Sequence, residues 1–219
     1  MAKMIDAAIL SIAYLPPIQY FAKLIHFQNV FLEASENYVK QTYRNRCVIL
    51  SANGPLPLVI PVIKARGNHT PIRLVEIDNS TLWQKNHWKT IESAYRTSAY
   101  FDFVADVLYP FYTHAYHNLY EFDLMLIKAI LSFLSLDVNL TATSVYVSQY
   151  NNSLDFRNSI QPKVKQSVDH QISSFEYFQV FSAKFGFVPN LSIIDLLFNE
   201  GLMAKRILEE SQKKPTPLG

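Results

Sequence analysis

The sequence predicts an α+β fold. Residues 1–80 are rich in strand and hairpin patterns and are expected to form a mixed sheet, which packs against a mainly helical half, residues 81–212. Two observations support this division: a strong hairpin signal in the first half, and a change to helical spacing of apolar residues at position 81. The length of 219 residues fits a single domain over 1–212, followed by a flexible tail at 213–219.

The first half is predicted to consist of strands separated by turns. The run Ala7–Ala13 is apolar except for Ser11 and is soon followed by Pro16-Pro17, so it predicts a strand of ordinary length. In the hairpin, Asn53-Gly54 supplies the positive φ angles that a tight turn requires. The other elements expected here are a helical segment at 18–25, a strand at 30–32, the hairpin strands ending at Leu50 and starting at Leu58, a turn at 66–69 and a strand around 72–77.

The second half is predicted to be mainly helical. Thr81 and Gln84 have the spacing of a capping box in front of a helix over about 82–97, and Ser192 with Asp195 repeats that pattern before Ile193–Asn199. Gly201 is the expected stop of the latter helix. The remaining expectations are a helix at 101–108, a long helix with Pro110 in its first turn that reaches Leu134, a helix at 202–211, and short strands near Val145 and Ile172.

Composition excludes several classes of protein. Only five glycines are present and no two lie close together, so neither a Walker A loop nor a Rossmann fingerprint can form, and we expect no cofactor. A single cysteine excludes an intramolecular disulfide and every CxxC zinc module, as in a reducing compartment. The most apolar stretch, Phe122–Leu136, is too short to span a bilayer, and the N-terminus lacks a cleavage site of small residues. We therefore expect a cytoplasmic protein with no transmembrane segment.

Charge is distributed unevenly along the chain. Residues 40–96 hold nine Lys and Arg against three acidic residues, a net +6, whereas residues 97–156 hold one Lys against six acidic residues, a net −5. The first region should attract an anionic small molecule or an acidic partner. A solvated basic face is the simpler alternative. An overall pI near 8.5 does not favour nucleic acid as the partner.

The polar segment Tyr43-Arg44-Asn45-Arg46 interrupts a stretch that otherwise has a strand pattern. Strand alternation would place Arg44 and Arg46 on one face and Asn45 on the other. Arginine pairs suit a carboxylate or a phosphate, with Lys64, Arg66 and His69 of the next loop at the border of the same region. The alternative is a pair of solvated edge-strand charges that discourage aggregation.

His87 interrupts an aromatic and aliphatic helix face. It is either a core histidine bonded to a nearby carbonyl or, at a pocket wall, a general base, since its ordinary pKa is close to neutral pH. Cys47 could only act as a nucleophile with His87 as its base, but a cysteine inside a strand pattern suits burial, and buried cysteines are usually inert.

His114, His117 and Glu121 would share one face of the expected long helix and could bind a metal with a further carboxylate such as Asp123. A solvated polar face is the alternative, and we predict no metal site. A further polar segment comprises Asp155-Phe156-Arg157 and Lys163, for which a local ion pair is expected rather than catalysis.

Several motifs together resemble the WbqC-like protein family, over about residues 7–210. They are Tyr14-Leu15-Pro16 with Tyr20-Phe21, the segment 43–46 with the return strand 58–62, Trp83 with His87, Ile91 and Ala94-Tyr95, and the run Leu191–Asn199 with Gly201. The family commonly opens with His-Gln-Pro-Asn before Tyr-Leu-Pro, whereas this chain has Leu10-Ser11-Ile12-Ala13. Cys47 does not belong to the family pattern.

The resemblance implies a role in O-antigen or other bacterial surface-polysaccharide biosynthesis, and a glycine transferase activity has been suggested for the family. Its shared polar positions here are Tyr14, Asn45, Arg46, His87, Tyr95 and Asp195. The resulting hypothesis is a transferase of an aminoacyl or acyl group that acts on a glycan precursor. His87 would be the base, Arg46 and Arg44 would hold a phosphate or oxyanion, and Tyr14, Asn45 and Tyr95 would orient the acceptor.

Two other functional classes remain open from the sequence: a non-enzymatic scaffold that binds an anion or an acidic partner, and a metal-dependent hydrolase built on the two histidines at 114 and 117. The sequence does not indicate the donor, the acceptor or the oligomeric state.

Overall fold

The computed structural model describes residues 7–64, 66–150, 153–162 and 175–211. Three expectations fall outside these residues: the strand near Ile172, the part of Lys163 in the polar segment around Asp155, and the tail at 213–219.

A four-stranded parallel sheet combines two strands from the first half of the chain with two from the second half. Its order is β7 (Asn139–Ala142), β2 (Asn29–Glu33), β1 (Ala7–Ser11) and β8 (Leu154–Asp155), and each neighbouring pair is parallel. The interior of β1 is fully buried. A central parallel strand is covered on both faces, which explains why β1 has a continuous apolar run instead of alternating polarity.

Two antiparallel pairs lie outside this sheet. The predicted hairpin is confirmed as β3 (Arg46–Ser51) and β4 (Gly54–Val59), and β5 (Val62–Ile63) pairs with β6 (Glu76–Ile77). In the hairpin turn only Gly54 has a positive φ, of 104°. The strands thus form one parallel sheet and two separate pairs, where the sequence suggested a single mixed sheet; the α+β class is confirmed.

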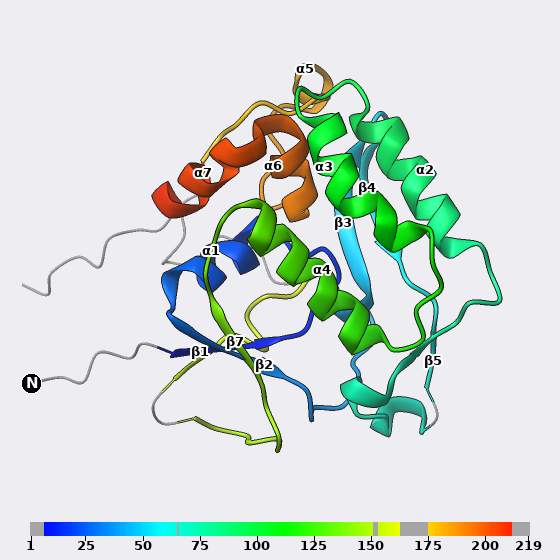
Figure 1. Cartoon of the computed structure of the whole chain (residues 1–219), viewed down its shortest axis with the longest axis vertical. Helices are drawn as coiled ribbons and strands as arrows, with labels where there is room; N and C mark the ends of the chain where they lie inside the picture. Colours follow the sequence, from blue (N-terminus) through cyan, green and yellow to red (C-terminus); the bar gives the residue numbers. More distant parts are fainter. Residues whose placement is uncertain (1–6, 65, 151–152, 163–174, 212–219) are drawn as a thin grey trace, which may run out of the picture.

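Helices supply the crossover and most of the second half. Helix α1 (Ile18–His26) links β1 to β2, and α2 (Trp83–Tyr95), α3 (Phe101–Leu108) and α4 (Leu119–Phe133) follow the hairpins. The chain then forms α5 (Ser182–Phe185), α6 (Ile193–Glu200) and α7 (Ala204–Glu210). Helices α6 and α7 contact α1, while α3 contacts both α4 and α6 (Figure 1). None of the helices in the described residues is long and apolar enough to cross a membrane.

The described residues also contain short 3₁₀ turns: η1 (Tyr43–Asn45), η2 (Gly67–His69), η3 (Ile72–Leu74), η4 (Tyr109–Tyr112) and η6 (Gly201–Met203). Of these, η1 and η3 replace residues that were expected to be strand, and η2 coincides with the predicted turn. The strand expected around 72–77 is therefore reduced to β6. The strand expected near Val145 occurs a few residues earlier, as β7.

The prediction of one long helix from Pro110 to Leu134 is wrong. Pro110 lies in η4, and the chain leaves helical geometry before Asn118, whose side chain caps α4 by accepting a hydrogen bond from the Glu121 amide at 3.0 Å. An Asx cap fixes the helix start there, because it satisfies an amide that would otherwise lack a partner.

The predictions of a capping box at the start of α2 and at the start of α6 are also wrong, although both helices are present. The residue before α2 is Leu82, and no side chain caps that helix. At α6 the Ser192 hydroxyl donates instead to the Leu15 carbonyl at 2.7 Å, and the Asp195 carboxylate faces the phenol of Tyr95. Tertiary partners thus compete successfully with local caps.

One hydrophobic core joins the sheet, the hairpin and the helices, from Ala8 to Leu208. Phe122 of α4 lies near its middle, with its ring 6.1 Å from the Tyr14 ring and 5.6 Å from Trp83. The aromatic surplus of the composition is therefore used largely for packing.

Candidate functional site at the carboxyl edge of the sheet

The carboxyl ends of the parallel strands carry polar side chains. Strand β1 ends at Ser11, β2 at Glu33 and β8 at Asp155, and Thr143 directly follows β7. Because all four strands run in the same direction, these ends meet at one edge of the sheet. This edge brings together residues that lie far apart in the sequence.

The strand order changes direction at this edge. From β1 the chain moves to β2 and then β7 on one side, and β8 then pairs on the other side of β1. In open parallel sheets, ligands bind outside the carboxyl ends of the strands at such a switch point. A crevice is present at this position, and its lining comes from the segments that follow β1 and β8 and from η1: Leu10, Ser11, Ile12, Ala13, Tyr20, Thr42, Tyr43, Arg44, Phe156, Arg157 and Ile160.

The crevice is narrow. It encloses about 270 Å³ of empty space with its open mouth included, of which about 10 Å³ admits the centre of a water molecule. A larger and more open hollow, with about 1280 Å³ of empty space of which about 790 Å³ admits the centre of a water molecule, lies between the end of α4 and the start of β7, at the opposite edge. Its lining contains Lys128 and Asp137 but no buried charge, whereas the crevice has two buried arginines, so we regard the crevice as the candidate site.

Arg44 forms one side of the crevice and is only 4% exposed. Its Nη2 lies 2.6 Å from Oε2 of Glu36, its Nε donates to Oε1 at 3.0 Å, and Nη2 also donates to the Ser11 hydroxyl at 2.9 Å. The expected strand alternation of Arg44 with Arg46 is wrong, and so is the alternative of solvated edge-strand charges for Arg44, because η1 turns this side chain inward to the Glu36 carboxylate. The two-point contact fixes the plane of the guanidinium group.

Arg157 forms the opposite side. Its Nη1 donates to Glu33 at 3.0 Å, and its Nε and Nη2 donate to Asp155, which confirms the expected local ion pair. Burial alone would raise the pKa of Asp155, but the hydrogen bonds and charge of Arg157 hold it below the ordinary value. The rings of Tyr146 and Tyr150 lie 4.9 and 5.3 Å from the guanidinium carbon. Aromatic faces and charged groups therefore meet around this arginine.

The charged groups at this edge do not form a basic pocket. Two guanidinium groups, of Arg44 and Arg157, face three carboxylates, of Glu33, Glu36 and Asp155, so the five groups together carry a net charge of −1. Carboxylates accept hydrogen bonds and guanidinium groups donate them. Such a mixed set matches hydroxyl groups, which both donate and accept.

His87 and Tyr14 lie within the core. The Tyr14 hydroxyl lies 3.0 Å from Nδ1 of His87 and 2.7 Å from the hydroxyl of Tyr112. Burial lowers the pKa of His87 to about 4, against a small opposing effect of a hydrogen bond with the Val59 backbone. His87 is 7% exposed and is neutral at pH 7. The alternative of a core histidine bonded to a carbonyl matches this geometry.

Asn45 and Tyr95 form structural hydrogen bonds. The Asn45 side chain donates to the Ile60 carbonyl at 2.8 Å, which joins η1 to the end of the hairpin. The Tyr95 hydroxyl donates to the Asp195 carboxylate at 2.8 Å and accepts from the Leu50 amide at 3.3 Å. Neither residue lines the crevice.

Comparison with known proteins agrees with these features. The model of the WbqC-like protein family matches residues 13–167. The chain belongs to the WbqC-like protein family. Among relatives, it is 28% identical to the uncharacterized protein Rv1507c of Mycobacterium tuberculosis over 219 residues, which covers 90% of this chain and 94% of that protein. No solved structure matches it.

The stretch Leu10–Ala13, which precedes Tyr14-Leu15-Pro16 in this WbqC-like chain, forms part of the crevice wall. The segment therefore has a position from which a side chain can contact a ligand, and Ser11 is its polar member.

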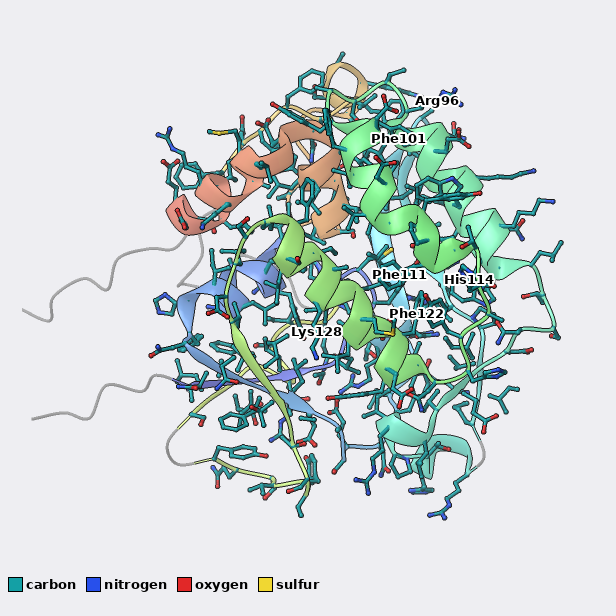
Figure 2. The ribbon with its side chains drawn as sticks, viewed as in Figure 1. Arg96, Phe101, Phe111, His114, Phe122 and Lys128 are labelled. Atoms are coloured by element: carbon teal, nitrogen blue, oxygen red, sulfur yellow. The ribbon has the colours of Figure 1, made fainter. Side chains whose placement is uncertain are left out.

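The structure excludes the metal geometry considered for this WbqC-like chain. His114 and His117 precede α4 and do not share a helix face with Glu121, and Figure 2 shows His114 on the connecting segment. No cluster of three metal-ligating side chains occurs in the part of the chain that the structure describes. The thiol of Cys47 is buried and its pKa is raised by burial, so its reactive thiolate form is disfavoured.

The sequence did not identify Glu33 or Glu36 as candidate site residues, and it indicated Asp123 only as a possible further metal ligand. The two glutamates could have been noticed only from the strand order, because they acquire their roles from Arg157 and Arg44. Asp123 had a signal, as a carboxyl group in the most apolar stretch of the chain. It is fully buried, neither of its oxygens has a hydrogen-bond partner among the described residues, and burial raises its pKa far above the ordinary value.

Proposed function

We propose that this WbqC-like protein is a cytoplasmic transferase that modifies a surface-polysaccharide precursor with an aminoacyl or acyl group, and that the sugar part of the precursor binds at the carboxyl-edge crevice. Membership of the family supports the choice of substrate class. The position of the crevice at a strand switch point supports the location of the site.

One observation carries the proposal: Arg44 and Arg157 are both buried at the crevice, each held by carboxylates, with the Ser11 hydroxyl bonded to Arg44. Their planar groups are oriented before any ligand arrives, so binding costs little ordering of side chains. Sugar hydroxyls can donate to the carboxylates and accept from the guanidinium groups. Tyr146 adds an exposed aromatic ring next to Arg157 for the apolar face of a sugar ring.

In this proposal His87 supports the site through its hydrogen bonds in the core and does not take part in the reaction. Tyr14 directly follows the crevice segment Leu10–Ala13, and its hydroxyl is held between His87 and Tyr112. This contact fixes the path of the chain immediately after β1. His87 is thus a positioning residue for the crevice wall.

A thermal-shift screen against nucleotide sugars, nucleotides, acyl carriers and amino acids tests the proposal, because a true ligand stabilises the folded state by mass action. We expect a nucleotide sugar to raise the melting temperature of the wild type. Ser11→Leu, which fills the crevice, should remove that shift. Ser93→Leu makes the same change on the exposed face of α2 and should keep it. An equal shift in both variants, or no shift by any nucleotide sugar, would contradict the proposed site.

The alternative function is non-enzymatic binding of an anion or partner. It is favoured by the burial of both His87 and Cys47, the side chains first considered for catalysis. It predicts that a bound ligand is recovered chemically unchanged and that binding weakens steeply with salt. Incubation with donor and acceptor followed by mass spectrometry separates the two functions, since only a transferase yields a precursor of increased mass.

A further inference from the structure

Tyr38 lies at the centre of a group of basic side chains on the segment that leads from β2 to η1. Its ring is buried, and its backbone amide donates to the Thr70 carbonyl at 2.9 Å. Nζ of Lys64 lies 5.8 Å from the centre of the ring. Burial raises the pKa of Tyr38, and the nearby positive charges of Arg44 and Arg46 oppose this effect. The buried ring of Tyr38 thus lies near Lys64 and within the influence of the charges of Arg44 and Arg46.

Two ammonium groups approach each other in this group. The pKa of Lys64 is lowered by partial loss of solvent and, next in size, by the positive charge and close contact of Lys40. Like charges repel, and an anion bound between the two side chains would relieve this repulsion. No carboxylate forms an ion pair with either lysine among the described residues.

Arg46 adds a third cation without an acidic partner. Its Nε is buried and donates no hydrogen bond within the described part of the chain. Arg44, in contrast, is neutralised by Glu36. A buried guanidinium N–H without an acceptor is costly, and a bound oxygen would satisfy it.

We propose that Lys40, Arg46 and Lys64, arranged around Tyr38, form a binding site for a phosphate group. We call these four residues the Tyr38 cluster. A phosphate offers several anionic oxygens, which can accept from two ammonium groups and one guanidinium group at the same time. Glycine-rich backbone cradles are absent, so side chains have to supply these donors.

The Tyr38 cluster adjoins the crevice. Tyr43 lines the crevice, and its pKa is raised to about 12 by burial first, with the positive charge of Arg46 as an opposing effect. A phosphorylated sugar could therefore place its sugar in the crevice and its phosphate on the cluster. This step rests on the proposed function and narrows its substrate class to sugar phosphates or sugars linked to a nucleoside diphosphate.

Calorimetric titration with inorganic pyrophosphate and with uridine diphosphate tests the site. We expect both to bind the wild type, and the double variant Lys40→Ala/Lys64→Ala to bind them about tenfold more weakly or worse, since it loses two charge-assisted contacts. The matched control is Lys85→Ala/Lys89→Ala, which removes the same charge from the exposed side of α2 and should bind within about twofold of the wild type. Tighter binding of uridine diphosphate than of pyrophosphate would indicate a nucleotide as the source of the phosphate.

Chemical labelling provides a second readout that does not depend on activity. A lysine of lowered pKa has more of the reactive free amine, so Lys64 should be acetylated faster than Lys85, and pyrophosphate should slow only Lys64 and Lys40. Equal loss of binding in both double variants, absence of pyrophosphate binding, or no protection of Lys64 would overturn the site.

The outcomes for site and function can be told apart. Pyrophosphate binding that depends on Lys40 and Lys64, without transfer to any glycan precursor, would keep the phosphate site and reject the transferase. Transfer that is unaffected in Lys40→Ala/Lys64→Ala would keep the transferase and reject the phosphate site.

Discussion

The guanidinium group of Arg157 donates to the carboxylate of Glu33 at 3.0 Å, although the two residues are 124 positions apart and both are buried. Their contact connects the carboxyl ends of β2 and β8 across β1. The Glu33 side chain also accepts from the Ser35 amide and the Thr143 hydroxyl. This network holds together the edge at which we place the ligand.

Loss of one partner of this ion pair should therefore destabilise the protein. We expect Arg157→Met to lower the free energy of unfolding by about 3–5 kcal/mol, because it leaves Glu33 buried without its positive partner. The double variant Glu33→Gln/Arg157→Met should recover part of that loss, since no uncompensated charge remains. Urea denaturation measures both values. A double variant at least as unstable as the single one would contradict this explanation.

Asp123 should make stability depend on pH. Its raised pKa means that the folded state prefers the neutral acid, so its favourable contribution is complete below the ordinary pKa near 3.8 and is lost as the pH rises through the folded-state pKa. Asp123→Asn should therefore gain stability relative to the wild type between pH 4 and pH 8. Asp106→Asn, at an exposed position of α3, controls for the loss of one negative charge. A difference between Asp123→Asn and wild type that is constant with pH would refute the burial of an ionisable group.

His87 should have the opposite pH dependence. Its pKa is lowered from 6.5 to about 4, so its contribution is present above pH 6.5 and is lost as the pH falls through 4. His87→Gln should reduce acid sensitivity in this range, with a difference on the order of 2–3 kcal/mol at most. Denaturation at pH 7, 5.5 and 4 gives the comparison. If His87 is instead the general base, turnover of folded His87→Ala falls by about a hundredfold even where the protein is stable, whereas a positioning role leaves a much smaller loss.

Gly201 and Gly67 allow a comparison of how much an added Cβ atom destabilises the folded state at two positions. Both have a positive φ, of 55° and 56°, but a Cβ on Gly201 would lie 2.5 Å from the ring of Tyr100, whereas a Cβ on Gly67 meets nothing within 4 Å. Gly67→Ala should cost about 1 kcal/mol from backbone strain alone. Gly201→Ala should cost about 1–3 kcal/mol more, because the ring has to move. Thermal unfolding of the two variants checks the difference, and equal losses would show that the ring yields freely.

Local pattern was sufficient for many of the elements. The hairpin around Gly54, the helix through His87 and the helix that ends before Gly201 all occur where the sequence indicates. Each has strong apolar periodicity or a residue whose backbone freedom the turn requires. The errors arise where partners from elsewhere compete, as at Ser192, whose hydroxyl bonds to Leu15 and not to its own helix.

The candidate site was less accessible to sequence reasoning. Arg44 was singled out with the correct chemistry but in the wrong local geometry, and Arg157 was expected only in a local pair. Glu33 ends β2 and Glu36 follows it closely, whereas Arg157 follows β8. Nothing in the spacing of these residues along the sequence indicates which arginine each glutamate pairs with. Charge counted along the chain predicted a basic region, whereas the two buried guanidinium groups at this edge are paired with two buried carboxylates, of Glu33 and Glu36.

By itself, the sequence determined the α+β class, the family, the absence of glycine-rich phosphate loops and the presence of a single cysteine. These follow from composition, periodicity and short motifs, which act over a few residues. Only the tertiary structure decided that Glu33, Arg44 and Arg157 meet at one edge and that His114 leaves the helix. The reason is physical: parallel strands bring distant chain segments to a common edge, and the pairing of buried charges there depends on strand order, which no local pattern contains.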